Sequence, residues 1–507
     1  MNVIKKFLII SIILAGLVIC VLLFSSGYIT IGFVAVLIWA LTSIIVLHPK
    51  AYPFRFMYPG LITFFLFMII PILFTVYIGF TNLGTGHLLS HSQVKDILLG
   101  ETYIPDSAGT YRYSLHEKHN GKIHINIRNT DTSKVYNGEL DLANNYKLSV
   151  RLTEGTTDAT EQYISPGKIF KILPILKKYQ LTMPDNKEVL RFASSNYLTD
   201  IRNRYSKVGE NSLKDNISGD IYHPDMYIGN YTNGRENISP GFFINVGFNN
   251  FIKLFTNKRI KGPFVKIIFW TLAWALSSVL LTFSLGIFLA VLVNGKKLRG
   301  KFLYRILLII PYSIPFFISV LIFKGLLNKD FGIINEIISS SSVNKINWLG
   351  DPLLAKISCL IVNLWLGFPY MFLVTTGILQ SIPSSVYEAA SLDGAGRLVT
   401  FRKITLPLIM SAVAPLLVGS FAFNLNNFVG IYLLTGGGPP MINATTPAGE
   451  TDILISYTYR LAFEGGQGQD FGMASAIALI IFILIAVLTV INFKLSGMFK
   501  ENTKGAE

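Results

Sequence analysis

The sequence has few charged residues and almost no cysteine. Of its 507 residues, 14% are Asp, Glu, Lys or Arg, whereas 51% are hydrophobic. Soluble domains carry about 25% charged residues, so much of this chain must face something other than water. The two cysteines, Cys20 and Cys359, both lie inside apolar runs, which excludes a disulfide framework and a cysteine metal site. The composition therefore indicates a membrane protein rather than a soluble enzyme.

The sequence also lacks the motifs of common enzyme classes. It contains no HExxH, CxxC pair, nucleophile elbow or Rossmann fingerprint. The run from Gly295 to Phe302 matches a phosphate-binding loop up to its last position, where a Ser or Thr hydroxyl should ligate magnesium. Phenylalanine supplies no such ligand, so we expect no catalysis by this chain, no metal site and no cofactor bound to it.

Basic residues exceed acidic ones, giving a formal net charge of +15. A nucleic-acid-binding surface would give the same total, but the basic residues cluster beside the apolar runs. These clusters are Lys5-Lys6, Lys50 to Arg55, Lys296 to Lys301 and Arg397 to Lys403. The charge therefore indicates membrane topology, and we expect no nucleic-acid partner.

Eight stretches are long and apolar enough to cross a bilayer, which takes about 20 residues of helix. Loops rich in Lys and Arg alternate with loops poor in them, and basic loops face the cytoplasm. This alternation predicts that both termini are cytoplasmic. The first apolar run, Phe7 to Phe24, is longer than the core of a signal peptide and a second run follows at once, so we expect an uncleaved first span. The stretches run approximately over 7–26, 28–47, 57–80, 264–294, 302–325, 354–380, 408–434 and 472–495.

A polar stretch at 84–258 separates the third and fourth predicted spans, and the alternation places it outside the cytoplasm. Its length, about 170 residues, suits a folded domain. Segments such as Lys122–Arg128 and Tyr146–Leu152 alternate apolar and polar residues, as β-strands do. We therefore predict an all-α polytopic membrane protein, 1–83 and 259–507, with a β-rich extracytoplasmic domain inserted between helices 3 and 4.

The most informative cytoplasmic segment is 388–407. Its first residues favour a helix, and the glycines that follow favour a turn with positive φ. The segment resembles the EAA loop of ABC importer permeases, in which Glu-Ala-Ala is followed at set spacings by Gly, Ile and Leu-Pro. That resemblance implies the type I permease fold and a loop that docks on a separate ATPase subunit, which binds ATP and Mg. The matching residues are Glu388, Ala389, Ala390, Gly394, Ile404, Leu406 and Pro407.

A second resemblance, covering most of the chain, is to the larger permease subunits of maltose/maltodextrin importers. It rests on the eight spans, the outer domain after the third and the carboxy-terminal run from Ser420 to Gly472. Related sugar permeases share parts of this pattern. Another oligosaccharide or polyol therefore remains an alternative substrate.

Polar side chains at membrane depth are costly and usually functional or paired. Two stripes of such residues occur at helical spacing, in the sixth and seventh spans. Amides, aromatic rings and a glycine together suit a sugar, but amides also join helices by hydrogen bonds, so the residues alone leave both interpretations open. The stripes are Asn363, Gly367 and Tyr370, and Ser420, Phe423, Asn424 and Asn427.

The resemblance favours the sugar, since in the resembling family it rests midway across the membrane against matching residues. Phe316 departs from the family pattern, where a small hydroxyl residue is expected, and this leaves the accepted sugars open. The implied substrate-binding residues are Tyr312, Asn363, Leu366, Gly367, Tyr370, Ser420, Phe423, Asn424 and Asn427.

The resemblance also implies a bacterial inner-membrane location and transport by alternating access. The expected partners are a second permease, a homodimer of ATPase subunits, a periplasmic sugar-binding protein and membrane lipid. Two other classes of membrane protein remain as alternatives. An ion-coupled secondary carrier should show internal repeats and no EAA loop, and a membrane sensor should carry an output module.

Overall fold

The chain folds into two compact units in a computed structural model. One unit combines Met1–Thr85 with Asn245–Glu507, and the other is Gly86–Ile244. The described residues are 3–27, 29–48, 54–117, 122–141, 149–155, 162–185, 188–295, 298–338, 345–442, 444–465 and 468–495.

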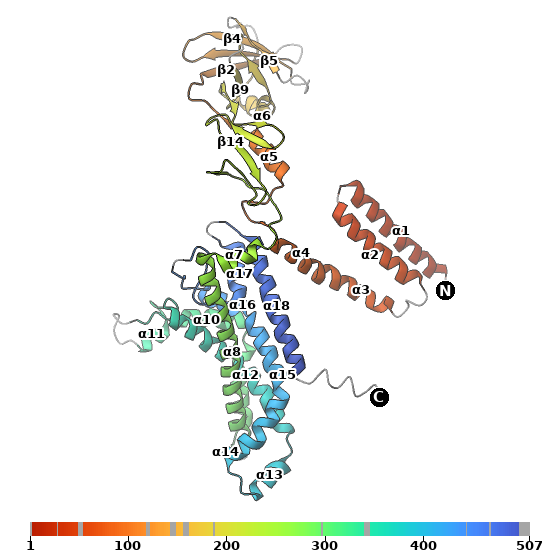
Figure 1. The fold of residues 1–507 in the computed structure, drawn as a ribbon, viewed down its shortest axis with the longest axis vertical. Coiled ribbons are helices and arrows are strands. Elements are labelled where there is room, and N and C mark those ends of the chain that lie inside the picture. The colour runs from red at the N-terminus through yellow and green to blue at the C-terminus, as the bar shows by residue number, and fades with distance from the viewer. Residues whose placement is uncertain are drawn as a thin grey trace. The chain divides into compact units, whose positions relative to one another are not determined.

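The first unit is helical (Figure 1). Most of its helices are apolar, and two short π-helical segments, η2 and η3, continue the helices beside them. The elements are α1 (Val3–Ser25), α2 (Ile29–Leu47), α3 (Phe54–Phe64), η2 (Phe65–Ile69), α4 (Ile70–Gly79), α7 (Asn249–Thr256), α8 (Lys258–Asn294), α9 (Lys301–Ser313), α10 (Phe316–Leu326), α11 (Ile333–Ile338), α12 (Pro352–Ser381), α13 (Ser384–Leu392), α14 (Arg397–Thr400), η3 (Phe401–Thr405), α15 (Leu406–Leu425), α16 (Phe428–Thr435), α17 (Leu454–Phe463) and α18 (Phe471–Leu495).

Among the described residues, four continuous helical segments are long and apolar enough to cross a membrane. They are Phe54–Gly79, Lys258–Asn294, Pro352–Ser381 and Arg397–Leu425. The pair α9 and α10 passes the same criterion jointly, but is bent by 89°. Shorter apolar helices lie at Ile13–Ser25, Gly32–Ile45 and Phe471–Val487, so each of the eight predicted ranges overlaps an apolar helix.

Two of the predicted ranges are interrupted helices. Pro315 separates α9 from α10, since proline has no N–H and keeps the residue before it extended; Ile314 has ψ 132°. The apolar range 408–434 is the second interrupted one. It divides at Asn426 and Asn427 because the Asn427 side chain accepts a hydrogen bond from the Gly430 amide at 3.2 Å and so caps the start of α16.

One of the buried apolar clusters of the helical unit lies among α8, α10, α12, α15 and α16. Trp274, Leu366, Leu425 and Ile431 are buried there in one apolar cluster. The two ends of these helices carry different elements: α13 and α14 lie at one end, and α7 and α17 at the other (Figure 1). The predicted EAA loop and the loop before α18 are thus at opposite ends of the unit.

The second unit is β-rich, as predicted. Eight strands follow one another in a sheet of order β5-β8-β9-β10-β2-β3-β4-β6, with β7 paired to β2; β12 to β16 form a five-stranded sheet and β1 pairs with β11. The elements are α5 (His91–Gly100), β1 (Thr102–Tyr103), β2 (Thr110–Glu117), β3 (Ile123–Asn129), β4 (Val135–Leu140), β5 (Ser149–Arg151), β6 (Thr153–Glu154), β7 (Gln162–Tyr163), α6 (Pro166–Leu176), β8 (Gln180–Thr182), β9 (Val189–Phe192), β10 (Tyr197–Asp200), β11 (Arg202–Asn203), β12 (Tyr205–Val208), β13 (Ser212–Asp215), β14 (Ile221–Asp225), β15 (Asn230–Thr232) and β16 (Asn237–Ile238).

The alternating pattern of the sequence predicts these strands where it is strongest. In β3, Ile123, Ile125 and Ile127 are buried, and the strand pairs antiparallel with β2 and β4. The second predicted segment is only partly described: β5 covers Ser149–Arg151, and residues 146–148 lie outside the described residues. The period-two pattern works here because alternate side chains of a strand point to opposite faces of the sheet, and the three isoleucines share the face that is packed in the core.

Candidate functional site

Three buried asparagines meet inside the helical unit. The Asn427 side-chain nitrogen donates to the Asn363 oxygen at 3.2 Å, and the Asn363 nitrogen donates to the Asn424 oxygen at 2.9 Å. Asn424 in turn donates to the backbone oxygen of Ser420 at 2.8 Å. Asn363 comes from α12 and Asn424 from the end of α15, so the amides connect residues 61 positions apart.

The break after α15 is what positions this chain of amides. The carbonyl of Asn424 lies in the last turn of α15, which ends at Leu425, and accepts from the Asn427 amide at 3.2 Å and from the indole nitrogen of Trp274 at 3.1 Å. Asn427 uses its oxygen to cap α16 and its nitrogen to bond Asn363. An amide group can donate twice and accept twice, so each of the three side chains retains capacity for a ligand.

The other predicted sugar contacts are placed around this group in different environments. Leu366 is buried in the same apolar cluster as Trp274, whereas Phe423 and Tyr312 are 65% and 56% exposed. Tyr370 and Ser420 are partly buried. Within the described ranges, the hydroxyls of Tyr312 and Tyr370 make no recorded hydrogen bond. The structure thus connects the three asparagines to one another and to the backbone oxygen of Ser420, and the sugar-binding role of the whole set stays a prediction.

Gly367 lies against α8. A Cβ atom at this position would come within 2.8 Å of the Thr282 methyl carbon, closer than side chains pack in proteins. The glycine therefore allows α12 to approach α8 closely, as small residues do between membrane helices. The sequence suggested that it admits the bulk of a sugar; the structure provides this second physical reason for a glycine.

Phe316, which departs from the family pattern, begins α10 and packs against the buried cluster. Its ring lies 3.4 Å from where a Cβ on Gly430 would stand, one helical turn beyond Asn427. The phenyl ring thus takes up space beside the amide chain, where a smaller residue would leave room.

The predicted coupling loop folds as a helix and a turn. Glu388, Ala389 and Ala390 lie in α13, and Gly394 adopts a left-handed φ of 72° directly after that helix. The Ala395 amide donates to the Ala390 carbonyl at 2.9 Å, a bond that closes a helix end when the residue before it is left-handed. Glycine at 394 meets this requirement without strain.

The rest of the loop leads into the long helix α15. Ile404 lies in η3, and Leu406 and Pro407 begin α15, where a proline in the first turn needs no N–H partner. Between α13 and η3 is a cleft of about 480 Å³. Leu392 and Leu398 beside it are 90% and 67% exposed. The cleft is lined by Val386, Ala389, Ala390, Asp393, Ala395, Val399, Thr400, Lys403 and Ile404.

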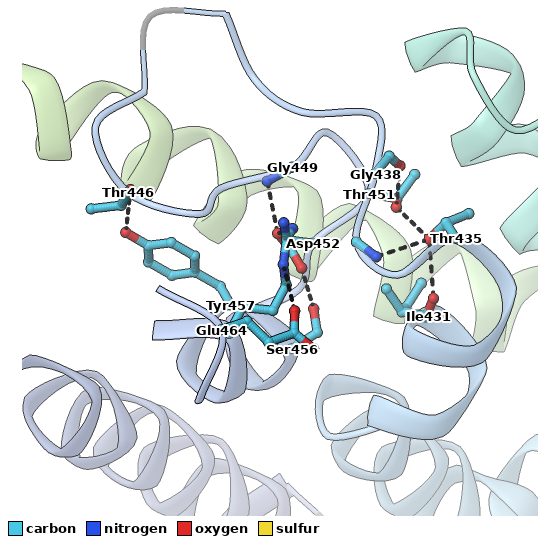
Figure 2. Close-up of polar contacts among 12 residues, drawn as sticks. Ile431, Thr435, Gly438, Thr446, Gly449, Thr451, Asp452, Ser456, Tyr457 and Glu464 are labelled. Carbon is cyan, nitrogen blue, oxygen red and sulfur yellow. Dashed lines mark hydrogen bonds and ion pairs between the residues drawn. The ribbon is translucent and has the colours of Figure 1, made fainter. Parts of the chain in front are cut away.

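A second buried polar cluster, missed at the sequence level, lies in the loop before α17 (Figure 2). The Asp452 carboxylate is fully buried and accepts hydrogen bonds from the Arg460 guanidinium at 2.7 Å, the Ser456 hydroxyl at 2.8 Å and the Gly449 amide at 2.7 Å. Arg460 also contacts Glu464 at 3.4 Å. This cluster joins the loop 436–453 to α17.

Burial raises the pKa of the Asp452 carboxyl to about 6, while Arg460, Ser456 and the Gly449 amide lower it in part. A hydrogen bond between the Thr435 and Thr451 hydroxyls at 2.7 Å extends the polar contacts toward α16 (Figure 2). The sequence signal that could have indicated this cluster is the acidic Asp452 followed eight residues later by the basic Arg460, after a run of glycines.

Family comparisons bear on both units of the chain. Residues 282–496 match the family described as Binding-protein-dependent transport system inner membrane component, and residues 89–247 match the Maltose transport system permease protein MalF P2 domain. These two matches cover the region of the asparagines and the coupling loop, and the β-rich unit, respectively.

Individual relatives match nearly the whole chain. The Maltose/maltodextrin transport system permease protein MalF of Escherichia coli (strain K12) is 38% identical over 489 residues, which cover 94% of this chain and 93% of that protein. The protein of the same name from Vibrio vulnificus (strain YJ016) is 37% identical over 494 residues, 94% and 92% of the two chains.

Among solved structures, a chain of a bacterial ABC transporter involved in the import of the acidic polysaccharide alginate is 25% identical. It covers 49% of this chain and 83% of its own, with a TM-score of 0.42. From the near-complete match to curated relatives, the chain belongs to the MalF family of maltose/maltodextrin transport system permease proteins, which are inner membrane components of binding-protein-dependent transport systems.

Proposed function

We propose that this chain is one permease half of an ATP-driven importer and that it carries maltose and maltodextrins across a bacterial inner membrane. The observation that carries this proposal is the chain of buried amides, Asn427 to Asn363 to Asn424, inside a protein of the MalF family. Buried polar groups in a membrane interior are costly unless they are paired or functional. Here they are paired with one another and retain capacity for a ligand.

A sugar would bind by replacing some of these amide contacts. Each asparagine both donates and accepts, so a hydroxyl can take the place of an amide partner without leaving a buried group unpaired. The rings of Tyr312, Tyr370 and Phe423 would lie against the apolar C–H faces of the sugar. When the sugar leaves, the amide–amide bonds close again, so the sugar-binding and helix-joining interpretations are compatible.

Coupling to ATP would pass through the segment 388–407. The cleft beside α13, the buried Ala390 and the exposed Leu392 and Leu398 form a surface suited to docking on an ATPase subunit. Closure of the two ATPase subunits would pull α13, and the movement would reach the asparagines along α15, which runs from Leu406 to Leu425. ATP and Mg would be bound by the ATPase and not by this chain.

The topology that we propose has eight spans, both termini in the cytoplasm and a periplasmic domain at 84–258 between the third and fourth. The partners are a smaller permease (MalG-like), a homodimer of an ATPase subunit (MalK-like) and a periplasmic maltose-binding protein. This arrangement accounts for the EAA loop and α17 lying at opposite ends of the helical unit (Figure 1).

The decisive experiment is uptake of labelled maltose, maltotriose and an unrelated sugar into proteoliposomes that contain this chain with its partner subunits and binding protein. We expect uptake that needs ATP and is confined to the maltose series. ATP-dependent uptake of a different sugar would refute the substrate, and uptake driven by an ion gradient without ATP would refute the importer itself.

The amide chain is tested by Asn424→Ala, with Asn426→Ala as the matched control. Asn426 is exposed and adjacent in sequence, so its loss removes an amide without touching the buried chain. We expect Asn424→Ala to abolish uptake in an assembled complex, while Asn426→Ala transports normally. Loss of assembly together with uptake would favour a purely structural role for Asn424.

Another oligosaccharide or a polyol is the second candidate substrate, and Phe316 is the observation that favours it. Its ring packs at Gly430, beside the amides, and would limit the space for a sugar there. If the natural substrates are maltose and maltodextrins, Phe316→Ser should extend uptake to longer maltodextrins. If it instead creates maltose uptake where the wild-type chain has none, the natural substrate is a different sugar.

A further inference from the structure

The segment from Phe248 to Trp270 joins an exposed apolar surface to an unusual concentration of positive charge. It contains five basic residues and no acidic residue. All five are exposed, and no ion pair to a carboxylate is recorded for any of them in the described part of the chain. The alternation of loops places this segment away from the cytoplasm, where basic residues are normally scarce. The five residues are Lys253, Lys258, Arg259, Lys261 and Lys266.

Helix α7 lies across the ends of α8 and α18 (Figure 1). Asn250, buried in α7, donates to the carbonyls of Gly79 and Thr81 at 3.0 and 2.8 Å and so fixes α7 at the end of α4 as well. Asn257 then caps α8 by accepting from the Arg259 amide at 3.1 Å. A short helix held across the ends of three apolar helices lies at the level where those helices leave the membrane.

The outer surface of this region is apolar as well as basic. Phe248, Ile252 and Phe255 are 67%, 53% and 48% exposed, and Phe269, on α8, is 68% exposed. Exposed aromatic and aliphatic side chains beside lysines are characteristic of helices that lie in the membrane interface, with the apolar face in the acyl region and the cations at the phosphates.

A cavity of about 490 Å³ opens on the same part of α8. Val265, Phe269 and Ala273 form an apolar strip along it, and Lys266 also lines it. The ammonium group of Lys356, also on the cavity wall, is held by Glu450 at 2.9 Å and lies 5.5 Å from the centre of the Trp270 ring. Lys356 is therefore already neutralised, whereas Lys266 has a charge available for an anion.

Helix α8 places two further cations on the same side as this cavity. Lys258 and Arg259 precede Val265 and Lys266 by seven residues, which is about two turns, so they lie on the same face of α8. We propose that this face binds an anionic phospholipid, with the phosphate at Lys266, Arg259 and Lys258 and an acyl chain along Val265, Phe269 and Ala273. The acyl strip favours a lipid over a soluble anion, and the absence of carboxylates from 248 to 270 favours a negatively charged head group.

The test uses the complete importer in nanodiscs of phosphatidylcholine with phosphatidylglycerol, and native mass spectrometry to count the lipids that stay bound. The variant is Lys258→Gln, Arg259→Gln, Lys266→Gln combined. The matched control is Lys171→Gln, Lys207→Gln, Lys214→Gln, which removes the same charge from exposed positions of the β-rich unit. Each basic residue near a membrane contributes about fivefold to binding of anionic lipid, so we expect at least a tenfold loss of retained phosphatidylglycerol in the variant and none in the control.

A second variant guards against a folding defect. Lys258→Arg with Lys266→Arg keeps the charge and should retain phosphatidylglycerol. Equal retention by the glutamine variant and the wild-type chain would overturn the proposal, as would equal loss in the control.

Spin labels at Phe255→Cys and Phe269→Cys should be reached by oxygen from the bilayer. Labels that are instead accessible to an aqueous relaxation agent until the binding protein is added would make this face a protein-docking surface.

Discussion

The buried ion pair between Asp452 and Arg460 allows a prediction with a definite size and pH dependence. Arg460→Met removes the only cation recorded at the Asp452 carboxylate among the described residues and keeps a long side chain in its place. The carboxylate is fully buried, so its charge would be left without compensation. Removing one partner of such a pair costs about 3–5 kcal/mol, whereas replacing both partners with uncharged residues costs much less.

The effect must depend on pH because the charge on Asp452 does. Its pKa is raised from 3.8 to about 6 in the folded protein. The folded chain therefore binds more protons than the unfolded chain between these values, and the contribution of this group to the free energy of unfolding falls as the pH rises through that window. Without Arg460 the folded-state pKa rises further, so the penalty of Arg460→Met should be small at pH 5 and grow toward pH 8.

Thermal unfolding in detergent, followed with a thiol-reactive dye, measures this directly. Cys20 and Cys359 are free and buried, so they react as the chain unfolds. At pH 8 we expect Arg460→Met to melt well below wild type and the double variant Asp452→Asn, Arg460→Met to recover most of the loss. Lys122→Met, in the exposed pair with Glu139, is the control and should cost at most about 1 kcal/mol. Identical melting of the single and double variants at pH 8 would refute the reasoning.

Three further predictions concern transport and packing. Asn427→Asp keeps the oxygen that caps α16 but loses the nitrogen that donates to Asn363, so the complex should assemble and uptake should fall strongly; normal uptake would show that this amide is not needed. Gly367→Ala places a Cβ within 2.8 Å of the Thr282 methyl and should destabilise the chain by about 1–3 kcal/mol in the same melting assay, with partial recovery by Thr282→Ala. Gly394→Asp should leave ATP hydrolysis by the complex but lose ATP-dependent uptake, since a charged side chain at a left-handed position disturbs the docking turn; equal loss of both activities would indicate failed assembly instead.

Much of the protein's organisation could be predicted from local composition. Apolar runs long enough for a membrane, a polar stretch between them and the alternation of isoleucines in β3 are properties of neighbouring residues, and each has a direct structural consequence. The left-handed turn at Gly394 belongs to the same class, because the backbone conformation required there is one that glycine adopts without strain. The EAA spacing and the overall resemblance were likewise sufficient to assign the family, which the comparisons confirm.

The tertiary structure decided what depends on residues far apart in the chain. The range 408–434 reads as one apolar helix, but Asn427 finds partners in Gly430 and Asn363 that make an interruption favourable. The sequence does not indicate that Asp452 is buried; in the folded chain Arg460 and the Gly449 amide both donate hydrogen bonds to its carboxylate. An amide or carboxylate forms a hydrogen bond with any suitable donor or acceptor that the fold brings within about 3 Å, so its partners are decided by how the helices and loops pack. Membrane insertion depends instead on the apolar side chains of each segment, which the sequence shows directly.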